Sequence, residues 1–142
     1  MISTQNTETW QAHHTIETAA TPDAIWRVFR DVPGWKRWNH GIEHVEIDGP
    51  FAIGSWLTMK PPGDDTLRTQ LIEVRENEKF VDETRVGDIV VTVEHVIEPV
   101  SASRTRVRYG IAVAGPGAAH VGPAISSDFP DVLAALARLV EA

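Results

Sequence analysis

The 142-residue sequence contains no cysteine, and this absence excludes disulfides, thiolate zinc sites and cysteine nucleophiles. A chain without cysteine suits a reducing compartment, so we expect a cytoplasmic protein. No apolar run approaches the ~20 residues of a membrane-spanning helix, and we expect no membrane insertion. Basic residues are also few: 13 Lys and Arg against 20 Asp and Glu give a net charge of −7. Because this charge repels phosphate backbones, we predict that the protein does not bind nucleic acid.

Alternating and β-branched residues fill most of the chain before residue 115 and predict a β-rich domain. The first expected strand is Trp10–Ala19, in which apolar and polar residues alternate. Six more strands are expected between turn residues, and these are Ile42–Ile47, Ser55–Lys60, Thr66–Arg75, Lys79–Arg85, Ile89–Glu98 and Arg104–Ala114. The links between these six strands are short, so neighbouring strands must run antiparallel.

Two short helices are expected between the first and second strands. Thr21 can cap the first helix, with Pro22 at its first position. The buried stripe of this helix is expected to contain Ile25, Val28, Phe29 and Val32. Pro33 and Gly34 then end it, and residues 35–38 form a second short helix or turn.

Residues 115–142 are the segment best suited to a long helix. An apolar stripe marks the second half and contains Phe129, Val132, Leu133, Leu136, Leu139 and Val140. Asp128 is the expected cap of that half. Pro123 and Pro130 each remove a helical hydrogen bond, so we expect a bend or break at Pro130 and an irregularity near Pro123. The first half, rich in small residues, would act as a flap over a cavity.

This order of elements resembles the helix-grip fold of the START-like superfamily. The residues that carry the resemblance are Thr21-Pro22 with Val28 and Phe29, Asp31 with Trp35 and Trp38, Asp48-Gly49-Pro50-Phe51 before Gly54, His95, Gly115-Pro116 and Pro130. They are similar to the polyketide cyclase/dehydrase and lipid-transport (SRPBCC) branch. The resemblance implies one α+β domain over residues 9–142, after a flexible tail at residues 1–8. In that domain a curved antiparallel sheet of about seven strands would wrap the long C-terminal helix.

The parity of the last two strands indicates which side chains face this helix. Apolar residues take the odd positions of both strands, and three arginines take even positions of the last one. His95 and Tyr109 are therefore expected to face inward, in register with each other. A two-residue hairpin at Gly87-Asp88 would also turn Phe80, Asp82 and Thr84 inward, whereas a three-residue loop would select Val81, Glu83 and Arg85.

A mostly apolar cavity with a few polar groups is what a small-molecule site needs. We therefore expect a monomer or homodimer that binds a hydrophobic or aromatic, lipid- or polyketide-like molecule between the sheet and the C-terminal helix. The candidate ligand-binding residues are His14, Trp56, Phe80, Thr84, Val91, Val93, His95, Val107, Tyr109, Ile111, His120 and Ile125. No cofactor or metal is expected, because the helical spacing of His40 and His44 is interrupted by Gly41.

Two other interpretations stay open. In a cyclase or dehydratase, His95, Tyr109 and Asp82 would donate and accept protons. In a protein-interaction module the core would be filled and an apolar patch exposed. His95 and Tyr109 would in that case bond each other or a buried water. The tryptophans at positions 26, 35, 38 and 56 are interpreted as packing residues rather than a ligand-binding cluster.

Overall fold

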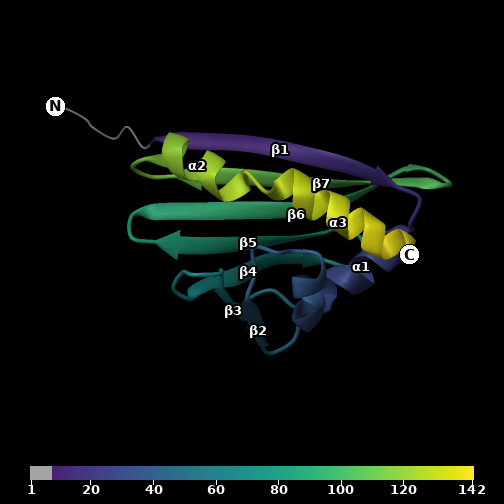
Figure 1. The fold of residues 1–142 in the computed structure, drawn as a ribbon, viewed down its shortest axis with the longest axis horizontal. Coiled ribbons are helices and arrows are strands. Elements are labelled where there is room, and N and C mark those ends of the chain that lie inside the picture. The colour runs from purple at the N-terminus through teal and green to yellow at the C-terminus, as the bar shows by residue number, and fades with distance from the viewer. Residues whose placement is uncertain (1–7) are drawn as a thin grey trace.

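A computed structural model of the protein describes residues 8–142. The elements, in chain order, are β1 (Thr9–Thr18), α1 (Pro22–Arg30), the 3-10 helix η1 (Val32–Arg37), β2 (His44–Asp48), β3 (Trp56–Lys60), β4 (Leu67–Arg75), β5 (Lys79–Val86), β6 (Ile89–Ser101), β7 (Arg104–Ala114), α2 (Ala118–Ser126) and α3 (Phe129–Glu141). Figure 1 shows α2 and α3 lying across one face of the sheet. The tail predicted at residues 1–8 lies outside the described residues, except for Glu8.

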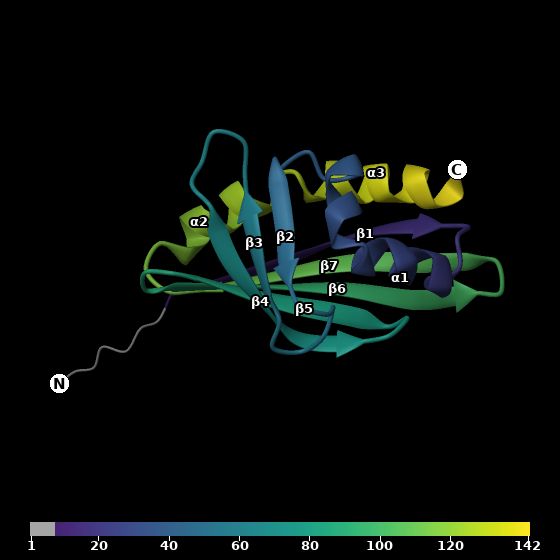
Figure 2. The ribbon, with the colours of Figure 1, turned by 90° about the horizontal axis from the view of Figure 1, so that it is seen from below.

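The seven strands form one antiparallel sheet in the order β1-β7-β6-β5-β4-β3-β2. Figure 2 shows that β2, β3 and β4 run steeply across the direction of β6 and β7, so the sheet curves around the helices. A register shift between Leu71 and Glu73 of β4 marks an irregularity in the β4–β5 ladder, and such bulges increase local twist. The predicted α+β helix-grip fold is therefore confirmed.

The α1 helix begins as its sequence predicts and ends earlier. The Thr21 hydroxyl accepts a hydrogen bond from the Ala24 N–H at 3.2 Å. The helix ends at Arg30, and Pro33 lies inside η1 instead of terminating α1. A proline is tolerated there because the first N–H groups of a helix have no intrahelical acceptor. Trp26 is buried and Val28 only partly so, which corrects the predicted stripe.

The C-terminal segment consists of two helices that are separated at Ser127 and Asp128. Pro130 is in the first turn of α3, where its missing N–H does least harm. The helix break predicted at Pro130 therefore lies two residues before it, at Ser127 and Asp128. Asp128 is at the capping position, but its side chain makes no capping hydrogen bond. Pro123 lies within α2, which continues through it from Ala118 to Ser126, so no break accompanies this proline.

The α2 helix packs directly on β1 and β7. A Cβ atom added to Gly122 would lie 2.0 Å from a ring carbon of Trp10. The Glu8 carboxylate accepts hydrogen bonds from the amides of Gly117, at 3.0 Å, and Ala119, at 2.9 Å. These contacts hold the first turn of α2 against the start of β1, so this helix is a packed element rather than the predicted flap.

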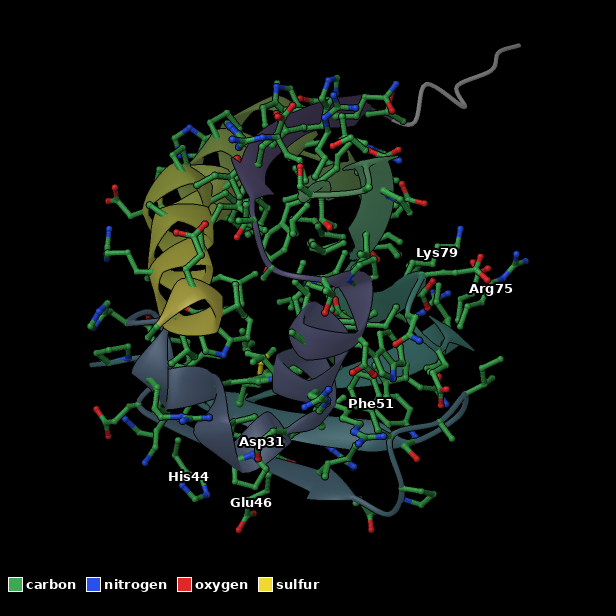
Figure 3. All side chains as sticks on the ribbon, turned by 90° about the vertical axis from the view of Figure 1, so that its right-hand side faces the viewer. Asp31, His44, Glu46, Phe51, Arg75 and Lys79 are labelled. Atoms are coloured by element: carbon green, nitrogen blue, oxygen red, sulfur yellow. The ribbon has the colours of Figure 1, made fainter. Side chains whose placement is uncertain are left out.

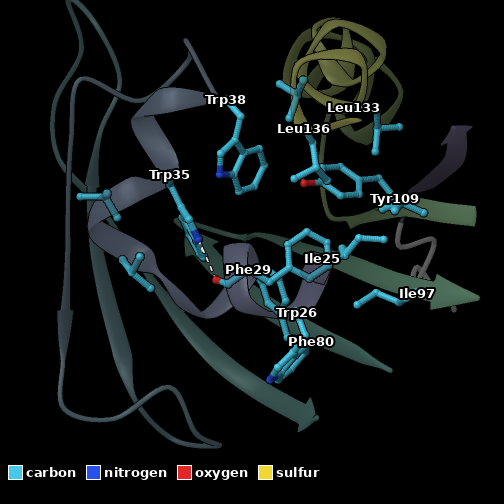
Figure 4. Close-up of a cluster of buried hydrophobic side chains, with 14 of the residues drawn as sticks. Ile25, Trp26, Phe29, Trp35, Trp38, Phe80, Ile97, Tyr109, Leu133 and Leu136 are labelled. Carbon is cyan, nitrogen blue, oxygen red and sulfur yellow. Dashed lines mark hydrogen bonds between the residues drawn. The ribbon is translucent and has the colours of Figure 1, made fainter. Parts of the chain in front are cut away.

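An aromatic and aliphatic core joins α1, η1 and α3 to the concave face of the sheet (Figure 4). Ile25, Phe29, Leu133 and Leu136 are at most 1% exposed. The Trp35 indole N–H donates to the Phe29 carbonyl at 2.8 Å. Burial of each of these large side chains contributes about 2–3 kcal/mol relative to leaving it exposed. The core thus fixes both short helices to the sheet.

The convex face of the sheet is charged and exposed. Figure 3 shows Arg75 and Lys79 at the outer side of the molecule, away from the helices. Ion pairs link the strands on this face, as between Arg106 and Glu17 at 3.3 Å. The arginines of β7 belong to this network, which confirms the solvent side that parity assigned to them. No helix among residues 8–142 is long and apolar enough to span a membrane.

Candidate functional site

A cavity of about 240 Å³ lies between the concave face of the sheet, η1 with the loop after it, and the junction of α2 and α3. Its aromatic lining is Trp35, Trp38, Phe80, Tyr109 and Phe129. Its aliphatic lining is Ile42, Met59, Leu67, Val86, Val91, Val93, Ile125 and Val132. The polar residues that line it are Asn39, Asp82, Thr84, His95 and Asp128. The cavity is therefore mostly apolar, with polar groups from several different elements.

The strand register explains how these polar groups meet. Val86 pairs with Ile89, so Gly87-Asp88 is a two-residue hairpin loop. This is the alternative that turns Phe80, Asp82 and Thr84 inward, and all three line the cavity. His95 pairs with Tyr109 across β6 and β7, as parity predicted.

Several of the predicted ligand-binding residues line this cavity, and they are Phe80, Thr84, Val91, Val93, His95, Tyr109 and Ile125. Asp82, a candidate for proton transfer, is with them. The remaining candidates lie elsewhere. Trp56 is on the convex side, 39% exposed, with the Arg68 guanidinium 5.0 Å from its ring centre. His120 is exposed on α2.

The other three misplaced candidates face the helices but are covered by them. Val107 belongs to the main core, and Ile111 packs with Ala118 in a smaller cluster under α2. His14 faces the edge of the Phe129 ring, with the ring centres 6.1 Å apart. Parity gave the face of these β1 and β7 residues correctly, but it could not show where along that face the helices leave a space.

Weaker signals in the sequence mark the lining residues that the prediction missed. Phe129 and Val132 were assigned to the apolar stripe of the terminal helix, which is also the side that faces the cavity. Trp35 and Trp38 were interpreted as packing residues, and they do pack, while also forming one wall. Asp128 was expected to cap α3. Because its carboxyl does not cap the helix, it is free to face the cavity.

His95 is buried between aromatic rings. Its ring stacks on the Phe80 ring with the ring centres 3.9 Å apart. The Tyr109 ring packs against it in a T-shaped arrangement, with the ring centres 4.6 Å apart. Nδ1 lies 3.2 Å from the Phe80 carbonyl oxygen. Since a carbonyl only accepts, Nδ1 carries the proton and Nε2 is left as an acceptor. Burial lowers the pKa of His95 to about 3, so the ring is neutral at physiological pH.

The Tyr109 hydroxyl is a buried polar group without a partner. The side chain is 3% exposed, and its oxygen has no hydrogen-bond partner among residues 8–142. Burial raises the pKa of this hydroxyl above its usual range, and the charges of Asp82 and Asp128 raise it further. Both carboxyls are therefore within electrostatic range of this one phenol. A neutral hydroxyl in the cavity wall can donate to a ligand or accept from it.

Asp82 is the most strongly perturbed acid of the site. Burial raises its pKa to about 7. The hydroxyl of Thr69, on the neighbouring strand, partly offsets this rise. Thr69 Oγ1 nevertheless lacks a hydrogen-bond partner of ordinary geometry within the described chain, so its effect on Asp82 is that of a nearby dipole. At neutral pH Asp82 is present both as carboxylate and as acid.

Asp128 lies nearer the surface, at the junction between α2 and α3. A Cβ atom added to Gly41 would be 3.0 Å from its Oδ2 atom, so the carboxyl faces the loop after η1. Burial is the main cause that raises its pKa, and the neighbouring charge of Asp131 adds to the effect. The site thus has a partly buried acid, Asp128, at the junction of the two helices and a buried acid, Asp82, on the sheet.

A curved sheet closed by helices around such a cavity is the helix-grip fold. The family model for polyketide cyclase/dehydrase and lipid transport matches residues 9–141, and the chain belongs to this family. No curated protein sequence matched the chain.

Solved structures share the fold at low sequence identity. The Zhui aromatase/cyclase from Streptomyces sp. R1128 has a TM-score of 0.79 and 16% identity, with 94% of each chain covered. Norcoclaurine synthase from Thalictrum flavum, described in complex with dopamine and hydroxybenzaldehyde, has a TM-score of 0.74 and 20% identity, covering 99% of this chain and 95% of that one. A START superfamily protein from Mycobacterium smegmatis has a TM-score of 0.74 and 18% identity, covering 92% and 97%.

Proposed function

We propose that the protein binds a small aromatic molecule in the cavity between the sheet and the α2–α3 junction. The observation that carries this proposal is the combination of a space of about 240 Å³ with five aromatic residues in its wall. An engineered protein cavity of about 150 Å³ holds benzene. A ligand of one or two rings therefore suits this volume better than a long acyl chain or a multi-ring polyketide.

Two polar groups can orient such a ligand. His95 offers Nε2 as an acceptor, because its Nδ1 proton is used by the Phe80 carbonyl. The Tyr109 hydroxyl has both its donor and acceptor capacity unused among the described residues. A ring that carries a hydroxyl would satisfy both, and leaving such groups unpaired costs about 1–3 kcal/mol. The small aromatic molecules in the norcoclaurine synthase complex support this choice of chemical class.

The first test is a titration with 2-naphthol, followed by calorimetry and by tryptophan fluorescence. Trp35 and Trp38 are in the cavity wall, so a bound ring should quench or shift their emission. Val93→Phe fills the cavity from β6 and should weaken binding by at least about tenfold, or ~1.4 kcal/mol. Val96→Phe, on the opposite face of the same strand, is the matched control and should leave affinity unchanged. Equal affinity of both variants would refute binding in this cavity.

Catalysis of proton transfer is a second candidate function, and the buried Asp82 favours it. A carboxyl whose pKa is about 7 can accept and return a proton at neutral pH. In an enolisation, its carboxylate would take a proton from the carbon beside a ligand carbonyl. The Tyr109 hydroxyl would donate a hydrogen bond to the resulting enolate oxygen.

Phenylacetone in deuterated water tests this reaction, because each enolisation and return exchanges an α-proton for deuterium, which NMR detects. Asp82→Asn should abolish catalysed exchange and retain phenylacetone binding. Exchange at the uncatalysed rate with the unaltered protein, under conditions where phenylacetone is bound, would exclude this candidate and leave the binding proposal intact.

A further inference from the structure

The cavity wall has charge of only one sign. Asp82 and Asp128 line it, and no lysine or arginine among residues 8–142 does so. His95, the remaining ionisable nitrogen group of the wall, is neutral because burial lowers its pKa to about 3, an effect that the hydrogen bond to the Phe80 carbonyl only partly offsets. The site is therefore able to carry up to two negative charges and has no positive charge of its own to balance them.

Two cationic side chains that flank lining residues in the sequence are engaged outside the cavity. Arg85 pairs with Glu83 at 3.1 Å, and the Arg68 guanidinium lies over Trp56. Neither Asp82 nor Asp128 forms an ion pair within the described part of the chain. Asp131, which follows Asp128 on the first turn of α3, adds like charge rather than compensation. An unpaired carboxylate in an apolar wall is unfavourable unless a ligand brings the opposite charge.

A second feature, independent of the acids, also indicates a ligand. The Tyr109 oxygen is buried and has no partner among residues 8–142, and the Tyr109 side chain lines the cavity. Its lone pairs can accept a hydrogen bond from an ammonium N–H. The rings of Trp35, Trp38, Phe80 and Phe129 surround the same space, and aromatic faces attract a cation that is held away from water.

From this arrangement we propose that the cavity selects a cationic aromatic ligand, an aryl-alkyl ammonium, over neutral and anionic analogues of the same size. The inference rests on the proposed function, since it names the charge of the aromatic molecule bound there. The ring occupies the apolar space, and the ammonium group lies between Asp82, Asp128 and the Tyr109 oxygen. The protein's net charge of −7 favours the approach of the same class of ligand.

Three ligands with the same ring and similar length test the proposal. They are 2-phenylethylamine, which is protonated at neutral pH, the neutral 2-phenylethanol and the anionic phenylacetate. Calorimetry at about pH 7.5 should give an affinity for the amine at least about tenfold above that for the alcohol, from charge-assisted hydrogen bonds. Phenylacetate should show no binding, because its carboxylate would meet two groups of like charge.

Variants of the two acids separate selectivity from folding. Asp82→Asn and Asp128→Asn should each lower amine affinity about tenfold and alcohol affinity by clearly less, so that the preference for the amine shrinks. Asp131→Asn is the matched control: it removes a neighbouring charge that is exposed and outside the cavity, so the preference for the amine should stay. Circular dichroism and melting curves of each variant report whether the fold is retained.

The outcomes distinguish selection of a cation from the proposed binding of a small aromatic molecule. If the alcohol binds as tightly as the amine, or phenylacetate binds at all well, the selection of cations is wrong while small-molecule binding stands. If the preference survives both Asp82→Asn and Asp128→Asn, its source is elsewhere and the assignment to these acids is overturned. If none of the three ligands nor 2-naphthol binds, both proposals fail together.

Discussion

The concave face of the sheet carries a packed region and a hollow region side by side. In the packed region, Phe29, Leu133 and Leu136 are at most 1% exposed and interlock beneath α1 and α3 (Figure 4). In the hollow region, a space of about 240 Å³ lies beneath the junction of α2 and α3. Strands β5, β6 and β7 contribute to both regions, so the difference comes from what covers the sheet.

Two features account for the hollow region. The helical chain is interrupted at Ser127 and Asp128, so no continuous apolar stripe covers the sheet there. The wall also contains Asp82 and the unpartnered Tyr109 hydroxyl. In a filled apolar core no ligand could pair with such groups, and leaving them unpaired costs about 1–3 kcal/mol each. The hollow region is thus specified by residues that a filled core would disfavour.

The largest effect on stability is expected when a large side chain of the packed region is shortened to alanine. Leu136→Ala should lower the free energy of unfolding by about 3–4 kcal/mol, because the surrounding side chains cannot close the space that is left. Val93→Ala, at the hollow region, should cost less than about 1.5 kcal/mol, since its side chain already borders an empty space. Urea unfolding of both variants measures the difference. Equal losses would mean that the two regions are packed alike.

The second prediction concerns pH, because the two buried ionisable groups of the hollow region oppose each other. The pKa of Asp82 is raised from 3.8 to about 7, so the folded state holds a proton that the unfolded state releases above 3.8. This contribution favours folding at low pH and is lost as pH rises to 7. The pKa of His95 is lowered from 6.5 to about 3, so its contribution is present above 6.5 and is lost as pH falls.

Between pH 3.8 and pH 6.5 the two groups change the free energy of unfolding in opposite directions as pH rises, so their contributions should cancel. Each contribution is at most about 1.4 kcal/mol per pH unit. Asp82→Asn should therefore unmask stability that rises with pH across this window, and His95→Phe should unmask stability that falls. Urea unfolding at several pH values gives both profiles, with Asp131→Asn as a control whose profile should run parallel to that of the unaltered protein. Parallel profiles for all three variants would show that the two buried groups do not titrate as described.

The packed region is also the part that the sequence specifies most directly. Capping by Thr21, the alternation of β1 and the parity of β6 and β7 depend on local periods, and each is found in the structure. Pro130 marked the helix break because a proline is tolerated in the first turn of a helix, where its missing N–H has no intrahelical acceptor, and not in the interior. These are properties of neighbouring residues, so one sequence is enough to predict them.

The position of the cavity depends on contacts between distant segments, which no local period records. Ile111 and Val93 pair across β6 and β7 on the same face, yet α2 covers Ile111 while Val93 lines the cavity. That outcome depends on Gly122, whose missing side chain lets α2 approach Trp10. Trp56 was misassigned although the alternation of β3 sets it on the outer side, opposite the inward-facing Leu57 and Met59.

A smaller effect is expected from the hydroxyl of Tyr109. Tyr109→Phe removes a buried group without a partner, so stability should rise by about 1 kcal/mol while 2-naphthol affinity falls several-fold. The opposite signs distinguish a ligand-binding hydroxyl from a structural one. A loss of stability would show that the hydroxyl is satisfied in the free protein, and would make this part of the wall resemble the packed region.

The smallest effect is expected at the far end of α2, where Glu8 joins the packed side of that helix to β1. The amide of Ala119, and then that of Gly117, hold the pKa of Glu8 below its usual value. Glu8→Gln should slightly lower stability near neutral pH and speed hydrogen exchange of those two amides. The difference from the unaltered protein should disappear as the pH falls and Glu8 itself becomes protonated, because a lowered pKa contributes stability only above it.

Ligand affinity should not change in this variant, because the end of α2 that reaches the cavity is Ile125, two helical turns from Ala119. Hydrogen exchange followed by NMR, combined with a 2-naphthol titration, measures both properties in one sample. A fall in affinity alongside faster exchange at Gly117 would mean that the packing of α2 and the shape of the cavity are coupled. The packed and hollow regions would then have to be treated as one unit, with Glu8 as a residue that acts on the site from outside it.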